Sequence, residues 1–264
     1  MEKVRAKKHL GQHFLTEVGI AEKLAAAVSG HGGTTNVLEI GPGTGILTRA
    51  LAADPGRKLK MVEIDSDSVR YLNERHPELA ESLIEADFLK MPLETIFSGQ
   101  PFALAGNFPY NISSQILFRL VDHRNLIPEC VGMFQREVAQ RIASPPGSKV
   151  YGILSVLVQT FYHTDYLFTV SEGCFSPPPK VKSGVIRLER NDRDGLPVPY
   201  PFLKTVVKTA FGQRRKTLRN SLAPLVGQYG TSLPEKYTGL RPEVLSPEAF
   251  IELAAAIRTP ESNR

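Results

Sequence analysis

The stretch "TNVLEIGPGTGILTRALAAD", residues 35–54, decides the fold of this chain. A short apolar run leads into Gly41, Gly43 and Gly45, and a helical pattern follows directly. Glycines at a strand-to-helix turn let the backbone approach a ligand, and the free N–H groups of the helix start lie beside them. Such a turn predicts a cofactor site without choosing the cofactor, because dinucleotide oxidoreductases use it too.

Outward from this stretch, strand-like and helical patterns alternate. Apolar runs typical of strands occur at residues 35–41, 58–65, 82–88, 101–107, 129–135, 164–170 and 183–190. Amphipathic or short connecting segments separate them, but no helical segment lies between the last two. We therefore predict an α/β fold with a Rossmann-like, doubly wound, mainly parallel seven-stranded sheet and an antiparallel hairpin at one edge.

A proline- and glycine-rich segment, "RDGLPVPYP", interrupts this pattern at residues 193–201. Beyond it, residues 202–226 and 246–258 have helical periodicity, and no further strand pattern follows. We predict a cofactor-binding domain over residues 1–190 and a small all-α domain over residues 191–264.

The composition is that of an ordinary soluble protein, with 264 residues, 42% of them hydrophobic and 22% charged. No apolar run could span a bilayer, and the N-terminus lacks the apolar core of a signal peptide, so a cytoplasmic protein without membrane contact is expected. Cys130 and Cys174 are too few for a disulfide framework and have no metal-ligand spacing, so no metal site is expected.

The formal net charge of +5 is unevenly distributed. Residues 195–234 contain no acid, and the N-terminus carries Lys3, Arg5, Lys7 and Lys8. Two basic segments favour a polyanionic partner, nucleic acid first, although basic faces are also common as plain solvated surface.

Polar residues follow the strands at regular intervals. Gly41, Glu63, Asp87 and Asn107 are each separated by about one strand–helix–strand unit. The carboxyl ends of parallel strands line one crevice, so we expect these residues to meet there. Glu63 is placed to accept from ribose hydroxyls and Asp87 from the amino group of an adenine. Two acids in this register suit S-adenosylmethionine better than NAD.

The segment "GNFPYN", residues 106–111, ends the fourth strand pattern. Asn107 offers a side-chain carbonyl and Pro109 a backbone carbonyl held by its ring. Two acceptors on a rigid turn can take both hydrogens of an adenine amino group and so make its nitrogen more nucleophilic. Tyr110 would stack on the base, and Phe108 would point into the core. The alternative is a simple turn with Tyr110 packed on the next helix.

These motifs resemble one known family. "LGQHFL", "VLEIGPGTGILT", "GNFPYNISSQI", "FSPPPKVKSGVIRL" and "FGQRRKTLRNSL" closely resemble the KsgA/RsmA family of small-subunit ribosomal RNA adenine N6,N6-dimethyltransferases. The resemblance implies a class I methyltransferase domain and a helical RNA-facing domain. It also implies cofactor contacts by His13 and Leu15, in addition to Gly41, Glu63, Asp87 and Asn107. His13 stands where the family commonly has Asn, and Phe108 where it has Leu or Ile.

The resemblance extends to the substrate side. Phe175 precedes a stiff triple proline and would form a second stacking wall opposite Tyr110; a place in the core is the alternative. A helix start with four cations would contact phosphates, with Arg215 and Arg219 on one face. These cations are Arg214, Arg215, Lys216 and Arg219.

With this resemblance, we expect a monomeric enzyme that dimethylates two adjacent adenines in a hairpin loop near the 3′ end of 16S rRNA, within an immature 30S particle; the substrate is what the resemblance implies. Two alternatives stay open. One is an Erm-like enzyme that acts on large-subunit rRNA, and the other is an RNA-binding assembly factor without turnover.

Overall fold

The computed structural model describes residues 4–193 and 195–258. They fall into two compact units: Met1–Gln140 with His163–Arg190, called unit 1, and Arg141–Tyr162 with Asn191–Arg264, called unit 2. The chain thus passes from one unit to the other near residue 190, where the sequence predicts a domain boundary. Residues 141–162, which the sequence places in the first domain, belong with the C-terminal helices.

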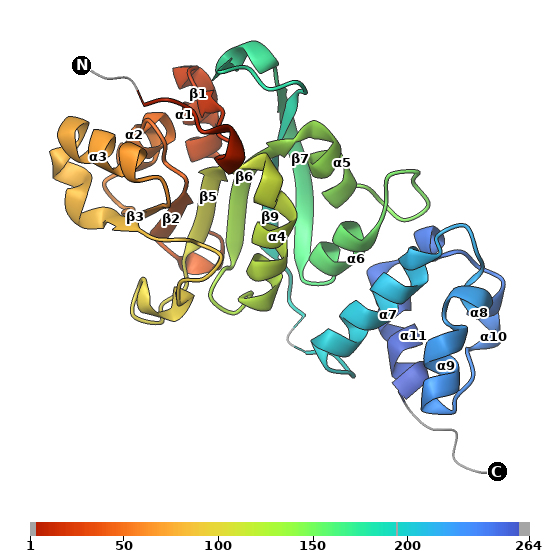
Figure 1. The fold of residues 1–264 in the computed structure, drawn as a ribbon. Coiled ribbons are helices and arrows are strands. Elements are labelled where there is room, and N and C mark those ends of the chain that lie inside the picture. Colours follow the sequence, from red (N-terminus) through yellow and green to blue (C-terminus); the bar gives the residue numbers. More distant parts are fainter. Residues whose placement is uncertain (1–3, 194, 259–264) are drawn as a thin grey trace. The chain divides into compact units, whose positions relative to one another are not determined.

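Unit 1 is built on a seven-stranded sheet in the order β4-β3-β2-β5-β6-β9-β7 (Figure 1). The strands are β2 (Asn36–Ile40), β3 (Lys58–Glu63), β4 (Leu83–Glu85), β5 (Ala103–Asn107), β6 (Glu129–Gln135), β7 (Tyr162–Val170) and β9 (Ser183–Arg190). The five strands from β4 to β6 are parallel, and β9 runs antiparallel to β6. The predicted mainly parallel sheet is confirmed, with β9 and β7 as neighbours at its edge.

The strand order reverses at β2, which lies between β3 and β5. Helices on either side of such a point diverge, so a crevice opens beyond the carboxyl ends of the strands. A separate two-stranded sheet joins β1 (Phe14–Leu15) to β8 (Phe175–Ser176). It brings the N-terminal segment into unit 1.

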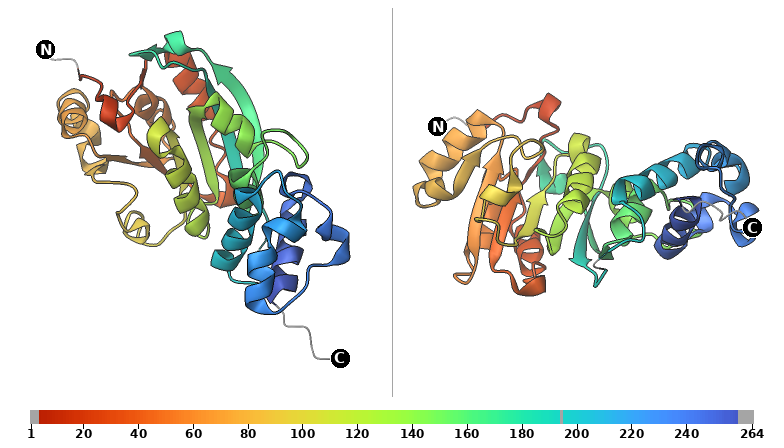
Figure 2. Two further views of the ribbon diagram at one scale, coloured as in Figure 1. Left: turned by 45° about the vertical axis from the view of Figure 1, so that its right-hand side comes forward. Right: turned by 90° about the horizontal axis from the view of Figure 1, so that it is seen from below.

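Helices cover both faces of the sheet (Figures 1 and 2). On one face, α1 (Val18–Ala26) and α2 (Ile46–Ala52) bury alternate side chains of the central strands in one apolar cluster. On the other face lies α4 (Ser113–Asp122), which buries its own apolar side. The remaining helices that begin in unit 1 are α3 (Ser66–Arg75) and α5 (Arg136–Ile142).

The end of β5 is packed around the ring of Phe108, which is 1% exposed, as predicted. The ring packs against Phe134, with centroids 4.9 Å apart. Gly106 and Gly132 make room for it, because a Cβ atom at Gly132 would lie 2.0 Å from Phe108 Cε2. Two glycines in neighbouring strands therefore let one aromatic ring anchor the turn that follows Asn107.

Unit 2 is helical. Its helices are α6 (Ile153–Gln159), α7 (Tyr200–Gly212), α8 (Leu218–Ser221), α9 (Ala223–Tyr229), α10 (Glu235–Thr238) and α11 (Pro247–Arg258). The rings of Phe211 and Phe250 stack at 5.8 Å between α7 and α11. Among the described residues no helix has both the length and the apolar character needed to cross a membrane.

The predicted helix over residues 202–226 is wrong in its middle. α7 ends at Gly212, and the Lys216 N–H bonds to the Gln213 carbonyl in a turn. Thr217, in an extended conformation, then starts α8. Arg215 and Arg219 are therefore not on one face of one helix.

We expect Gly132→Ala to destabilise unit 1 by about 1–3 kcal/mol, because the added methyl group overlaps the Phe108 ring. Denaturant unfolding measures the effect. Gly173→Ala is the control, since a Cβ atom there meets nothing within 4 Å. Equal stability of the two variants would contradict this packing.

Candidate active site

A cleft lies at the carboxyl ends of β2, β3, β4 and β5, and all its walls belong to unit 1. Its lining comes from the N-terminal segment, the glycine turn and the loops that follow three strands. The residues are Leu10, Gly11, Gln12, His13, Phe14, Ile40, Gly41, Gly43, Val62, Glu63, Ile64, Ala86, Asp87, Phe88, Leu89, Asn107, Phe108, Pro109, Tyr110, Asn111 and Ile112. The predicted convergence of Gly41, Glu63, Asp87 and Asn107 is thus present in the structure.

The glycine turn and Glu63 form one wall. Glu63 is 5% exposed, and its Oε2 accepts from the Gly43 N–H at 3.2 Å. Its Oε1 accepts from the N–H groups of Ile64 at 2.9 Å and Asp65 at 3.0 Å. Burial raises the pKa of Glu63, and these N–H groups act against the rise. The side chain is held with both oxygens at the cleft, where they can also accept from ligand hydroxyls.

Asp87 lies on the same wall, at the end of the third strand unit. Its Oδ1 accepts from the Leu89 N–H at 2.9 Å, and its Oδ2 lies 3.4 Å from Lys90 Nζ. Beside it the cleft is apolar, with Ile64, which is 52% exposed, and Phe14 in the lining. The wall therefore combines carboxylate acceptors with apolar side chains, which suits a nucleoside.

The Asn107 side chain has a fixed orientation. Its Nδ2 donates to the backbone carbonyl of His13 at 2.8 Å. The amide oxygen accepts no hydrogen bond from any other residue that the structure describes. Because the amide nitrogen faces the His13 carbonyl, the amide oxygen is the end of the side chain that is left to accept a hydrogen bond in the cleft.

The carbonyl of Pro109 is already in use. It accepts from the Ile112 N–H at 3.3 Å and from Ser113 Oγ at 3.2 Å, which closes the turn into α4. The carbonyl of Phe108, one residue earlier, accepts no hydrogen bond within the described ranges.

Tyr110 is held from two sides. Its hydroxyl shares a short hydrogen bond with the Ser183 hydroxyl at the start of β9. Its ring lies 5.5 Å from the imidazole of His13, tilted by 31°. His13 Nδ1 in turn donates to the Pro177 carbonyl at 2.9 Å, which fixes the imidazole. Tyr110 is therefore fixed in place at the cleft, which it lines.

Two predicted contact residues lie in the core. Leu15 and Phe175 are each 4% exposed, are paired across β1 and β8, and belong to the same apolar cluster. Neither side chain lines the cleft. The second stacking wall predicted at Phe175 is thus absent from this structure, because strand pairing turns the ring inward.

The basic residues after α7 differ in their surroundings. Arg214 donates to the Lys149 carbonyl at 2.8 Å and lies 3.8 Å from Glu243, so it is a structural contact within unit 2. Arg215, Lys216 and Arg219 are exposed.

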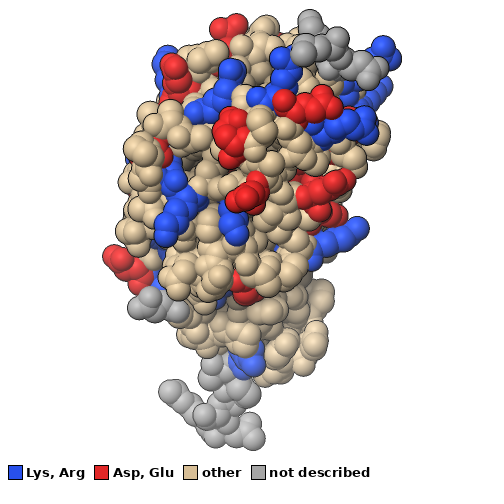
Figure 3. Space-filling model, turned by 90° about the vertical axis from the view of Figure 1, so that its left-hand side faces the viewer, with Lys and Arg blue, Asp and Glu red and all other residues tan. Residues whose placement is uncertain are grey.

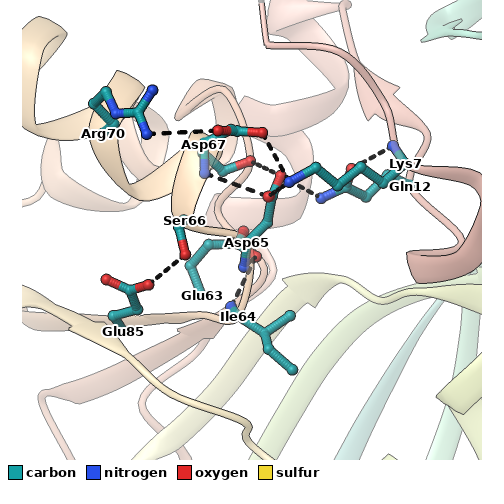
Figure 4. Close-up of polar contacts among 10 residues, drawn as sticks. Lys7, Gln12, Glu63, Ile64, Asp65, Ser66, Asp67, Arg70 and Glu85 are labelled. Carbon is teal, nitrogen blue, oxygen red and sulfur yellow. Dashed lines mark hydrogen bonds and ion pairs between the residues drawn. The ribbon is translucent and has the colours of Figure 1, made fainter.

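At the N-terminus, Lys7 is paired with Asp65 and Asp67 (Figure 4). It is therefore an internal contact of unit 1 and not the free cation that the charge pattern predicts. Lys3 lies outside the described residues.

Several residues in or beside the site could not be predicted from the sequence. Phe14 lies over the glycine turn, since a Cβ atom at Gly43 would be 2.8 Å from its ring. Ser183 and Asp65 act through contacts with residues far away in the chain. The motif "LGQHFL" signals the N-terminal segment as a whole, but no local pattern reveals these pairings.

A second buried acid, Glu39, lies in β2 just before the glycine turn and is 1% exposed. Burial, followed by the nearby charge of Glu63, raises the pKa of Glu39 to about 8. Its Oε2 has no hydrogen-bond partner among the described residues. Glu39 is therefore mainly protonated at neutral pH.

Between the ordinary pKa of a glutamate and the raised pKa of Glu39, this side chain is protonated in the folded protein and ionised in the unfolded chain. The wild type should therefore lose stability between about pH 5 and pH 8 by up to about 1.4 kcal/mol per pH unit relative to Glu39→Gln. Denaturant unfolding at several pH values tests this, with the exposed Glu22→Gln as the control. Parallel curves for wild type and Glu39→Gln would contradict it.

Comparisons with known proteins identify the family of the chain. The sequence matches the family described as "Ribosomal RNA adenine dimethylase" over residues 3–244. It is 56% identical over 259 residues to "Ribosomal RNA small subunit methyltransferase A" of Porphyromonas gingivalis, covering 98% of this chain and 100% of that protein. The protein of the same name from Flavobacterium johnsoniae is 53% identical over 258 residues, covering 97% of each.

Among solved structures, a dimethyladenosine transferase from Plasmodium falciparum superposes with a TM-score of 0.76 at 25% identity, over 91% of this chain and 96% of that one. The 23S rRNA methyltransferase ErmE shares the fold, with a TM-score of 0.66 at 23% identity over 93% and 100% of the two chains. The chain belongs to the ribosomal RNA adenine dimethylase family.

Proposed function

We propose that this protein uses S-adenosylmethionine to dimethylate N6 of two adjacent adenines in a hairpin loop near the 3′ end of 16S rRNA. The family match and the relatives named for the small-subunit RNA, at 53–56% identity over nearly full length, support this choice. The likeness to ErmE is one of fold, so it does not favour a large-subunit substrate.

The orientation of Asn107 carries the proposal. Its amide nitrogen is occupied by the His13 carbonyl, so its oxygen can accept one hydrogen of an adenine amino group. The exocyclic nitrogen of adenine is a weak nucleophile because its lone pair is delocalised into the ring. A well-placed acceptor favours the pyramidal form of that nitrogen and returns electron density to it.

A second acceptor is needed for the other hydrogen. The Pro109 carbonyl, which the sequence suggests, already accepts two hydrogen bonds. We assign the role to the carbonyl of Phe108, a residue that lines the same cleft and whose carbonyl accepts no hydrogen bond from the described residues. Pro109 contributes by restricting the backbone of the residue before it to extended conformations, which fixes the direction of that carbonyl.

The bound cofactor supplies an electrophilic methyl group on a positively charged sulfur. Glu63 is placed to accept from the ribose hydroxyls, and Asp87 from the adenine amino group. The open backbone at Gly41 and the apolar surface of Ile64 fit the rest of the nucleoside. For His13 we propose contact through its backbone, since its ring is held by Pro177 and Tyr110.

Methyl transfer needs no general base before attack, because the proton can leave to water once the nitrogen is cationic. Tyr110, held by Ser183, offers a face on which the target base stacks, a contact of about 1–3 kcal/mol. After the first methylation one hydrogen remains on the nitrogen, so a single acceptor and the stacking contact serve the second transfer.

We propose that unit 1, which comprises residues 1–190 without residues 141–162, is the methyltransferase domain, and that unit 2, which includes residues 191–264, is the RNA-facing domain with Arg215, Lys216 and Arg219 on phosphates. These cations are exposed within an acid-free segment. By contrast, on the side of the molecule that carries α3, basic and acidic side chains are interspersed (Figure 3). We also propose that the enzyme acts as a monomer in the cytoplasm and that its substrate is the rRNA of an immature 30S particle.

The proposal is tested by transfer of labelled methyl groups to unmethylated 30S and 50S particles, followed by nucleoside analysis. We expect dimethyladenosine in 30S particles only, at two methyl groups on each of two adenines. Label in 50S particles would indicate an Erm-like activity. Binding without any label would indicate an assembly factor without turnover.

Asn107→Ala should lower the single-turnover rate of methyl transfer by about 10²–10³-fold, because it removes an acceptor that acts in the transition state. RNA affinity should stay within about twofold of wild type. Asn36→Ala is a matched control, since that amide lies at the opposite end of β2 and bonds to the Pro101 carbonyl. A single-turnover rate within threefold of wild type would refute the acceptor role.

A further inference from the structure

The N-terminal segment of residues 7–15, called the strap, touches several loops at the carboxyl ends of the strands. One part contacts the turn after β3, and another contacts the turn after β5. Between them, the Phe14 ring lies over Gly43 in the turn after β2. The strap therefore forms one wall of the cleft and joins its cofactor side to its substrate side.

On the cofactor side, the strap is bound to Asp65 (Figure 4). Lys7 Nζ makes an ion pair with Asp65 Oδ1 and lies 2.8 Å from Asp67 Oδ2. Gln12 Nε2 donates to Asp65 Oδ2 at 3.1 Å, and Gln12 Oε1 accepts from the Lys7 N–H at 2.7 Å. Two side chains of the strap, Lys7 and Gln12, thus converge on a single carboxylate.

Asp65 is fully buried as a side chain, whereas the Lys7 side chain is 34% exposed. Burial alone would raise the pKa of Asp65, but hydrogen bonds from Lys7, Gln12 and Ser68 outweigh it and lower that pKa. The hydrogen bond to Asp65 also raises the pKa of Lys7. A buried carboxylate without its cation is strongly disfavoured, so this pair holds the strap down.

On the substrate side, the strap is bound to the turn that carries the acceptors. The His13 carbonyl accepts a hydrogen bond from Asn107 Nδ2 at 2.8 Å, and the His9 carbonyl accepts one from Asn111 Nδ2 at 3.2 Å. Gly11, with φ +66°, passes so close that a Cβ atom would lie 2.6 Å from Asn111 Oδ1. Little displacement of the strap is possible without loss of these contacts.

The turn after β3 also serves two purposes. The Asp65 N–H donates to Glu63, while the Asp65 carboxylate holds Lys7 and Gln12. The same residue therefore orients the proposed ribose acceptor with its backbone and the strap with its side chain.

We propose that Lys7 and Asp65 are positioning residues for methyl transfer: their ion pair fixes the strap, so that the His13 carbonyl holds the Asn107 amide in the accepting orientation. The proposal rests on the proposed function of the cleft. It gives Lys7 a role inside the enzyme, although its basic neighbourhood in the sequence favours an RNA contact.

Three variants test it. Lys7→Met removes the charge and keeps the length of the side chain, and Lys7→Arg restores the charge. Arg70→Met is the matched control, because Arg70 also pairs with Asp67, at 3.8 Å, on the same turn of α3 but does not contact the strap. Thermal unfolding verifies that each variant is folded.

For Lys7→Met we expect about tenfold weaker S-adenosylmethionine binding by calorimetry and a lower kcat at saturating cofactor, with an unchanged KM for RNA. Amide hydrogen exchange of residues 7–15 in the cofactor-free protein should be faster by about tenfold. Lys7→Arg should recover most of each property, and Arg70→Met should match wild type.

Exchange and cofactor affinity within twofold of wild type in Lys7→Met would overturn the proposal. So would a variant that changes only the KM for RNA, since that result would make Lys7 a phosphate contact. Absence of S-adenosylmethionine binding by the wild type would instead refute the proposed function of the cleft, so the two failures are distinguishable.

Discussion

The hydrogen bond from the Asn107 amide to the His13 carbonyl is the constraint on which the proposed active site depends. A primary amide can present either a donor or an acceptor, and only the acceptor can draw on an amino hydrogen of adenine. The rest of the site supports this choice. Phe108 anchors the turn beneath the amide, Tyr110, the proposed stacking surface, is tied to Ser183 of β9, and the strap is tied to Asp65 in the turn after β3.

The acids around the cleft are kept in different states by their surroundings. Glu39 has no charged partner and is mainly neutral, whereas Asp65 is stabilised as a carboxylate by Lys7 and Gln12. Glu63 lies between these cases, with three N–H groups that offset part of its burial. The neighbouring carboxyl groups thus differ in how readily they ionise, which limits the repulsion between buried charges.

The features that follow from local patterns could be predicted from the sequence. Strand periodicity, the glycine turn and the spacing of Glu63, Asp87 and Asn107 follow from such patterns, because parallel strands necessarily bring their carboxyl ends together. The turn after Gly212 is not predicted, because the residues on both sides of it have helical periodicity.

Contacts between distant segments could not be predicted. Phe175 and Leu15 are buried because β1 pairs with β8, and these two strands lie far apart in the sequence. Lys7 is internal because a carboxylate far along the chain is buried beside it. Neither fact leaves a periodic signal, since side-chain burial and ion pairing depend on the folded neighbourhood of each residue.

Because residues 141–162 belong to unit 2, the two units cannot be separated by a simple truncation. The chain crosses between the units three times, so a single cut does not separate them. A fragment truncated at residue 190 would retain α6, with Leu154, Val156 and Leu157 buried in the intact chain, but would lack α7 and α11, which pack against it. Such a fragment would expose an apolar surface and tend to aggregate, so an isolated catalytic domain calls for a redesigned connection in place of residues 141–162.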